Sequence, residues 1–432
     1  MMNYSETIAY LQSALPMFHR IGPAAYKANL DNTYALMDLL NNPHQKIKCI
    51  HIAGTNGKGS TSNMLASILQ EAGYKTGLYT SPHLKDFRER IRVNGEMVNE
   101  EWIANFVSLN KNDFDKIQPS FFEMTTAMAF AYFDFMQTDI NIIETGLGGR
   151  LDSTNVIHPI ASVITNIGYD HMNLLGNTLE KIAVEKAGII KHNCPVIISE
   201  TQEGLASIFQ NKSSELNAPI LFADQQWKIH HELKSLFDES MAVTAMNQQT
   251  ESTLTFNCEL TGPYQTKNIA GVLACIDELN KQGYSISDLN IQVGMHNIKR
   301  NTGFKGRWYK LQENPLVMCD TAHNKEGLQQ ILPIISNYNI GKIRIVLGMV
   351  DDKDIASVLP LFPTQAMYYF CKADIPRGLD ANILKEKANT FHLNGNVYSS
   401  VQAALSNAIN DSASNDLIFV GGSTFTVAEI ID

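Results

Sequence analysis

The sequence predicts an α/β protein built on parallel sheets, and three observations carry this prediction. Short apolar runs alternate with helical patterns along most of the chain, the order typical of a parallel sheet with helices on both faces. In the first half of the chain, the apolar runs expected to form strands are 49–53, 76–80, 140–144, 161–166 and 195–199. Helical spacing separates them, as in 122–136 and 179–187. A second α/β series begins after residue 300, with strands expected at 316–319, 343–347, 367–370 and 417–420.

Two segments interrupt this alternation. Residues 205–262 differ in pattern, and 252–260 alternates like an antiparallel strand, so we expect a small appended β subregion there. Residues 294–306 are polar and contain glycine, which is typical of a hinge. The 432 residues are therefore expected to form two domains, 1–297 with the β subregion and 298–432.

The composition excludes several classes of protein. Hydrophobic residues make up 44% and charged residues 18%, which is ordinary for a globular chain. The net charge of −10 argues against a nucleic-acid partner or an anionic membrane surface. The six cysteines are scattered without a Cys-x-x-Cys pair, which favours free thiols in a reducing compartment. With no signal peptide and no apolar run long enough for a bilayer, we expect a cytoplasmic protein.

A glycine-rich segment after the first expected strand is the strongest indication of function. It leads into a helical pattern over 61–72 and consists of Gly54, Thr55, Asn56, Gly57, Lys58, Gly59 and Ser60. Glycines allow a turn that points several N–H groups at an anion, and a helix N-terminus adds partial positive charge. Lys58 would neutralise a β- or γ-phosphate, and the Ser60 hydroxyl would bind Mg²⁺. Gly59 departs from the usual P-loop spacing by separating the lysine from the serine. The alternative is a tight glycine turn capped by Ser60.

Polar residues also follow other expected strands, where ligands gather in open α/β sheets. Glu144 ends the strand 140–144, and a carboxylate beside a phosphate loop suits a hard cation. An ion pair with Arg150 is an equally good explanation of Glu144. The glycines of 146–149 do not form a Gly-x-Gly-x-x-Gly fingerprint, which disfavours a dinucleotide site.

Two further residues, Ser81 and His171, occupy comparable positions, and Lys186 lies in the helical stretch 179–187. Ser81 follows the strand 76–80 and offers a hydroxyl near the same sheet edge. His171 follows the strand 161–166 and is a candidate metal ligand, with a hydrogen-bonded structural histidine as the alternative. Lys186, taken alone, is a helix lysine before the C-cap glycine Gly188.

The second α/β series has one such cluster. Asp320, His323 and Asn324 come after the strand 316–319, placing an acid, an imidazole and an amide at one strand end. Helix capping is the alternative for Asn324. No Gly-x-Ser-x-Gly, His-Glu-x-x-His or paired-cysteine signature occurs, so the sequence does not support covalent catalysis by a side chain.

Taken together, these motifs resemble one family, the folylpolyglutamate synthase/dihydrofolate synthase family of the Mur ligase superfamily. The match is dense from 47 to 192 and looser beyond 200. The segments that carry it are 51–60, 80–83, 90–95, 122–126, 144–155, 185–189 and 320–324. The chain departs from the family at Phe304–Arg307, where Trp-Pro-Gly-Arg is usual, and at Thr321, where glycine is common. Residues 20–27 resemble the segment that precedes the glycine-rich motif in the family only loosely, so the resemblance assigns no pterin contacts to them.

The resemblance implies a P-loop ATPase domain with a small β subregion, followed by a Rossmann-like C-terminal domain. It implies that residues 54–60 bind the phosphates of ATP and that Lys186 is carbamylated by CO₂. It also implies contacts of Asn268 and Arg307 with the nucleotide. On this reading the catalytic residues are Lys58, Lys186, Asp320 and His323, with Asp320 also contacting the nucleotide, and the Mg²⁺ ligands are Ser60, Ser81, Glu144 and His171.

The resulting hypothesis is ATP-driven amide formation between a folate or dihydropteroate carboxylate and the amine of L-glutamate, through an acyl phosphate. Such chemistry depends on positioning and charge neutralisation more than on an enzyme nucleophile. Another Mur-type ligase acting on a peptidoglycan precursor remains a rival. A non-catalytic nucleotide-binding switch is a rival from a different class. We expect a monomer.

Overall fold

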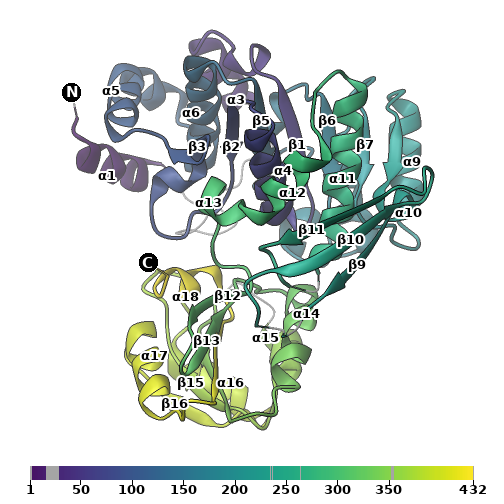
Figure 1. Ribbon diagram of the computed structural model, residues 1–432. Helices are drawn as coiled ribbons and strands as arrows, with labels where there is room; N and C mark the ends of the chain where they lie inside the picture. The colour runs from purple at the N-terminus through teal and green to yellow at the C-terminus, as the bar shows by residue number, and fades with distance from the viewer. Residues whose placement is uncertain are drawn as a thin grey trace. The chain divides into compact units, whose positions relative to one another are not determined.

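The computed structural model describes residues 2–15, 29–233, 235, 237–262, 264–351 and 355–431, so the lead-in at 20–27 lies outside the described residues. The chain divides into two compact units, which Figure 1 shows in purple to green and in green to yellow. Unit 1 comprises Met1–Glu232, Ser240–Glu259 and Gln265–Phe304, and unit 2 comprises Leu233–Glu239, Leu260–Tyr264 and Lys305–Asp432. The domain boundary expected at 297/298 stays a prediction.

A large sheet forms the centre of unit 1. Within the described residues it has eight strands in the order β4-β3-β2-β5-β1-β6-β7-β8. The central strand β1 (Cys49–Ala53) is buried along its whole length, as expected for a parallel strand covered on both faces. It pairs in parallel with β5 and β6, and among the described strands only β3 runs antiparallel to its neighbours, β2 and β4. The other strands are β2 (Thr76–Tyr79), β3 (Ile91–Val93), β4 (Glu96–Met97), β5 (Ile140–Glu144), β6 (Ala161–Ile164), β7 (Val196–Ile198) and β8 (Ile220–Phe222).

Helices pack against this sheet and against one another. Those of unit 1 are α1 (Tyr4–Ala14), α3 (Asp31–Leu39), α4 (Lys58–Glu71), α5 (Glu100–Ile117), α6 (Phe121–Met136), α7 (Met172–Leu175), α8 (Leu179–Ala187), α9 (Ala206–Glu215), α10 (Ala223–Gln226), α11 (Gln265–Lys281), α12 (Asp288–His296) and α13 (Ile298–Thr302). One apolar core joins α1, α3, α5 and α6 to strand residues such as Tyr79 and Ile143. A second joins α8 and α9 to Ile164 and Ile198. Each fully buried apolar side chain contributes about 1.5–3 kcal/mol.

A small antiparallel sheet adjoins α11 and α12 in unit 1. Its strands, in the order β11-β10-β9, are β9 (Trp227–Glu232), β10 (Met241–Asn247) and β11 (Thr253–Cys258). Buried and exposed residues alternate along β10 and β11, because one face of the sheet packs on the protein and the other meets solvent. The preceding residues 205–226 form α9, β8 and α10, and β8 is the edge strand of the large sheet.

Unit 2 contains a second sheet, with helices of its own. Across its described residues the sheet has six strands in the order β12-β13-β17-β14-β15-β16, with only β12 antiparallel. The strands are β12 (Tyr309–Gln312), β13 (Leu316–Cys319), β14 (Ile343–Leu347), β15 (Met367–Phe370), β16 (Gly395–Val397) and β17 (Leu417–Gly421). The helices are α14 (Lys325–Ser336), α15 (Ile355–Val358), α16 (Ala381–Asn389), α17 (Val401–Asn410) and α18 (Thr424–Ala428). These two sheets confirm the predicted α/β fold class.

Candidate active site

The glycine-rich segment forms a turn between β1 and α4 in which two glycines are required. Gly54 has φ +149° and Gly57 has φ +87°, values that L side chains rarely adopt. A Cβ on Gly54 would lie 1.8 Å from the Thr165 hydroxyl oxygen, and one on Gly57 would lie 2.2 Å from Asn268 Oδ1. Helix α4 begins at Lys58, so its first N–H groups lie at this turn. The geometry suits the binding of an anion.

Hydrogen bonds from backbone and side-chain groups tie this turn to the loop after β6. Thr55 N donates to Asn166 O at 2.8 Å, and Asn56 N donates to Asn166 Oδ1 at 2.8 Å. The Thr165 hydroxyl donates to Asn56 O at 2.5 Å. The loop that carries His171 is thereby fixed to the phosphate-loop candidate.

Two lysine ammonium groups converge on one carbonyl oxygen of this turn. Lys58 Nζ lies 2.9 Å and Lys186 Nζ 2.8 Å from Gly54 O. Lys58 Nζ also donates to Thr55 O at 3.2 Å. The two cations are neighbours in spite of their like charge, so an anion placed here would relieve their repulsion.

Lys186 is almost fully buried, with 3% of its surface exposed. Burial, and next the charge of Lys58, lower the pKa of Lys186 to about 7, against the opposing influence of Asp170 and Asp152. A substantial fraction of Lys186 is therefore a neutral, nucleophilic amine near neutral pH. The local sequence pattern identified Lys186 only as a lysine near the end of a helix.

Glu144 and Ser81 lie close together at the carboxyl edge of the large sheet. Glu144 ends β5 with 4% exposure, and its Oε2 accepts a hydrogen bond from Ser81 N at 3.3 Å. A Cβ on Gly59 would lie 3.9 Å from the same oxygen, so the carboxylate borders the first turn of α4. Arg150, the alternative partner of Glu144, forms an ion pair of 2.8 Å with Glu185.

Helix α11 brings two amide side chains to the phosphate-loop candidate. Gln265 Nε2 donates to the buried Ser60 hydroxyl at 3.2 Å, and Asn268 Nδ2 donates to Gln265 Oε1 at 2.8 Å. Asn268 was expected from the family resemblance, whereas Gln265 was missed. Its position one helical turn before Asn268 was the available signal.

The oxygen atoms of Ser60, Ser81 and Glu144, with the imidazole of His171, are donors that suit a hard divalent cation. His171 opens α7, and its Nε2 lies 3.9 Å from Asp170 Oδ2. Among the described residues, no three His, Cys, Asp or Glu side chains gather as a metal site. The predicted set holds only two residues of those types, so it stays a prediction.

The cluster predicted in unit 2 centres on Asp320, which is buried after β13. Its Oδ2 accepts hydrogen bonds from Trp308 N at 2.7 Å and Tyr264 Oη at 2.9 Å, and its Oδ1 from Ala322 N at 2.8 Å. Burial raises the pKa of Asp320, and the Arg307 charge opposes that rise. Tyr264 was not singled out from the sequence.

The neighbouring predicted residues have local partners. His323 Nδ1 lies 3.0 Å from Thr321 O, which assigns the Nδ1 proton to that contact. Arg307 Nη1 donates to Gly306 O at 3.3 Å. Asn324 Oδ1 accepts a hydrogen bond from Gly327 N at 2.8 Å and caps α14. Helix capping was the alternative interpretation of Asn324 from the sequence.

A buried polar chain beneath the sheet edge was also missed. His51 Nε2 lies 2.8 Å from Thr154 Oγ1, which donates to Asp152 Oδ1 at 2.5 Å. Asp152 Oδ2 accepts from Leu147 N at 2.7 Å. Burial lowers the pKa of His51 to about 3, so the ring is neutral and donates through Nε2. These bonds fix the glycine loop that follows Glu144.

Comparisons with known proteins define the class first. Residues 52–276 match the Mur ligase middle domain, and residues 306–424 match the glutamate ligase domain of Mur ligases. The chain is thus a Mur ligase.

Relatives in sequence narrow this class. The chain is 34% identical to a dihydrofolate synthase/folylpolyglutamate synthase of Bacillus subtilis, over 94% of each chain. It is 30% identical to a folylpolyglutamate synthase of Lacticaseibacillus casei, over 97% of this chain and 96% of the relative. The chain belongs to the folylpolyglutamate synthase/dihydrofolate synthase family.

Similar solved structures come from the same family. Escherichia coli FolC in complex with DHPP and ADP aligns with a TM-score of 0.85 at 29% identity, over 99% of this chain and 97% of that one. A bifunctional folylpolyglutamate synthase/dihydrofolate synthase with Mn, AMPPNP and L-glutamate bound aligns with a TM-score of 0.82 at 28% identity, over 100% and 97%. The family predicted from the motifs is confirmed.

Proposed function

We propose that this chain is an ATP-dependent ligase that adds L-glutamate to a folate, to dihydropteroate, or to both. One observation carries the proposal: Lys58 and Lys186 converge on Gly54 O at the start of α4, within a chain that matches folate ligases over nearly its full length. A paired cationic site on a glycine turn is suited to a polyphosphate.

In this proposal the phosphates of ATP lie against residues 54–60, and Lys58 offsets charge on the transferring phosphoryl group. Asn268, Arg307 and Asp320 contact the nucleotide. Ser60, Ser81, Glu144 and His171 hold a divalent cation, proposed to be Mg²⁺, which would neutralise phosphate charge when bound. His323 and Asp320, both in unit 2, are proposed as catalytic residues.

The reaction proceeds in two displacements. An oxygen of the substrate carboxylate attacks the γ-phosphorus, and the bond from that phosphorus to the β–γ bridging oxygen breaks, releasing ADP. The glutamate amine, after losing a proton, then attacks the carbonyl carbon of the acyl phosphate, and inorganic phosphate leaves. The protein contributes positioning and electrostatic stabilisation, so it needs no nucleophile of its own.

We further propose that Lys186 is carbamylated. The neutral amine would attack CO₂ to form an N–C bond and release a proton, which converts a buried cation into an anion. Its pKa of about 7, set by burial and then by Lys58, supplies the neutral amine that this step requires. The change of sign would also remove the repulsion between the two lysines.

We propose that the protein acts as a monomer in the cytoplasm with small-molecule substrates and without nucleic acid, in keeping with its net charge of −10. Across the described residues, no helix combines the length and apolarity needed to cross a membrane.

A product assay tests the proposal. The purified protein, ATP, Mg²⁺ and L-glutamate are incubated with dihydropteroate in one arm and tetrahydrofolate in the other, and products are identified by mass. Glutamate addition in either arm supports the proposal and separates its two activities. Glutamate-dependent phosphate release without a pterin would count against folate ligation, and nucleotide binding without ligation would support the switch.

A further inference from the structure

The connection between β2 and β3 carries Ser81, and an unusual set of bonds holds it in shape. At its base, Thr80 N donates to Arg90 O at 3.1 Å. At its start, Ser81 N donates to Glu144 Oε2 at 3.3 Å. The conformation of this connection therefore decides where the Ser81 hydroxyl lies relative to Glu144.

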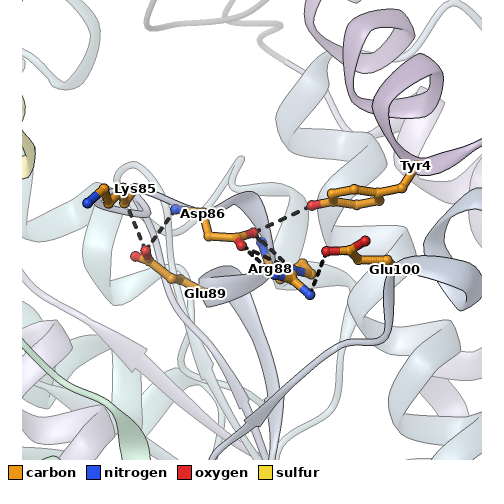
Figure 2. Close-up of polar contacts among 6 residues, drawn as sticks. All are labelled: Tyr4, Lys85, Asp86, Arg88, Glu89 and Glu100. Carbon is orange, nitrogen blue, oxygen red and sulfur yellow. Dashed lines mark hydrogen bonds and ion pairs between the residues drawn. The ribbon is translucent and has the colours of Figure 1, made fainter. Parts of the chain in front are cut away.

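One carboxylate captures three consecutive backbone N–H groups of this connection. Glu89 Oε2 accepts from Leu84 N at 2.7 Å, and Glu89 Oε1 accepts from Lys85 N at 3.0 Å and Asp86 N at 2.8 Å. Figure 2 shows the bonds from Lys85 and Asp86 converging on the carboxylate. Three amides directed at one anion form a concave nest, and bonds to an ionised acceptor are stronger than neutral ones.

Arg88 ties the outer side of the connection to two helices. Its guanidinium donates to both oxygens of Asp86, with Nη2 2.7 Å from Oδ2, and Nη1 lies 2.9 Å from Glu100 Oε1 at the start of α5. The guanidinium also lies over the ring of Tyr4 in α1, 5.6 Å from its centroid (Figure 2). The turn is thus braced against α1 and α5.

Arg90 holds the inner side of the β2–β3 connection in place. It is buried, with 3% exposure, and its Nε donates to His83 Nδ1 at 2.7 Å. Because arginine only donates, this imidazole nitrogen is the acceptor and His83 carries its proton on Nε2. The ring of Phe121 lies 5.4 Å from the guanidinium carbon. The residues next to Ser81 are therefore fixed from both sides.

We propose that Glu89 is a positioning residue for the divalent-cation site: by holding the N–H groups of residues 84–86, it keeps Ser81 beside Glu144. The inference rests on the proposed function, because the roles of Ser81 and Glu144 are proposed there. Exposed ion pairs alone contribute little to stability, so the value of this network lies in geometry.

Glu89→Ala and Glu89→Gln test this inference in the full-length protein. Asp224→Ala is the matched control, because Asp224 also bonds a backbone amide in unit 1, that of Thr201 at 2.7 Å, away from the β2–β3 connection. The readouts are the Mg²⁺ concentration for half-maximal ligation rate, kcat, and the thermal unfolding midpoint. Ser81→Ala is measured in parallel.

We expect Glu89→Ala to raise the half-maximal Mg²⁺ concentration about tenfold, the size typical when a partner that orients metal ligands is lost. Glu89→Gln should give a smaller rise, because one acceptor oxygen remains. Asp224→Ala should change the Mg²⁺ requirement by less than about twofold, as for most surface substitutions.

A folded Glu89→Ala protein with an unchanged Mg²⁺ requirement, alongside a shifted Ser81→Ala protein, overturns the inference and leaves the proposed function intact. If Ser81→Ala also leaves the Mg²⁺ requirement unchanged, both the metal set and the inference fail. Should Glu89→Ala not fold, Glu89→Gln decides by the same measurement.

Discussion

The turn after β1 and the turn after β13 occupy equivalent places at the carboxyl ends of parallel strands, yet they use charge differently. In unit 1, the ammonium group of Lys58 donates to the neutral carbonyl oxygens of Gly54 and Thr55. In unit 2, the carboxylate of Asp320 accepts from Trp308 N, Ala322 N and the Tyr264 hydroxyl. The charge of Lys58 is not neutralised by these carbonyl partners, so it can act on an anionic ligand. The charge of Asp320 is largely engaged by hydrogen bonds that hold the turn in shape.

This contrast predicts that substitutions in the first turn reduce activity with little loss of stability. Lys58→Ala should lower the ligation rate by about 10³-fold, the effect of removing one preorganised group that stabilises transition-state charge. Initial rates at saturating ATP measure the activity, and the thermal unfolding midpoint measures the stability.

Lys75→Ala is the matched control for Lys58→Ala, since Lys75 Nζ also donates to a backbone carbonyl oxygen, that of Met136 at 2.5 Å. It should keep its ligation rate. A Lys58→Ala protein that ligates at the native rate would contradict the proposed phosphate site.

The second turn should behave in the opposite way. Asp320→Ala leaves buried donors without an acceptor and should lower the free energy of unfolding by about 3 kcal/mol. Asp320→Asn keeps one carbonyl oxygen and should cost less. Urea unfolding of both variants measures the difference, and an Asp320→Ala protein as stable as the native one would show that the carboxylate has no structural role.

Lys186 sharpens the comparison because its proposed carbamylation would depend on pH and CO₂. Removing CO₂ and bicarbonate should lower the ligation rate about tenfold, as expected when an anion near a metal is lost. Added bicarbonate should restore the rate, and more completely at pH 8 than at pH 6, because only the neutral amine reacts with CO₂ and the pKa of Lys186 is about 7. A rate indifferent to CO₂ would exclude carbamylation.

Stability should also report on Lys186. Its pKa is about 7 in the native state against an ordinary 10.5, so between these values the unfolded chain binds more protons. The free energy of unfolding attributable to Lys186 therefore rises with pH from about 7 to 10.5. Lys186→Met should lack this rise when urea unfolding is compared at pH 7, 8 and 9.

The smallest effect expected is at the cap of α14. Asn324→Ala removes the bond to Gly327 N and should destabilise unit 2 by about 1 kcal/mol, the usual cost of an N-cap. Asp380→Ala, which removes the cap of α16, is the control for a capping loss elsewhere in unit 2. A far larger loss of activity than of stability for Asn324→Ala alone would indicate a direct role in the reaction.

Much of the fold, and several residues of the candidate site, could be predicted because their signals are local. Burial of β1, β5 and β13 makes their sequences mostly apolar, with His51 and Asn141 as buried polar exceptions, and so Glu144 and Asp320 stand out where each run ends. The family motifs then added Lys186 and Asn268, to which periodicity alone assigned no role.

The residues that escaped prediction act through distant partners. Glu89 reads as one acid in a charged stretch, and only the folded turn brings three N–H groups to it. Asp152 and His51 are 101 positions apart and meet through Thr154. The depressed pKa of Lys186 likewise depends on burial by segments far away in sequence.

Gly54 O accepts from two ammonium groups, and this shared acceptor implies an order of events. Carbamylation would leave the Lys186 nitrogen a single N–H donor, and if Lys58 then turns to an incoming phosphate, the oxygen loses both of its ammonium donors. In the proposed mechanism, CO₂ and nucleotide would therefore be coupled through this one peptide group, and rates measured after premixing the protein with each reagent in turn would show which must be added first.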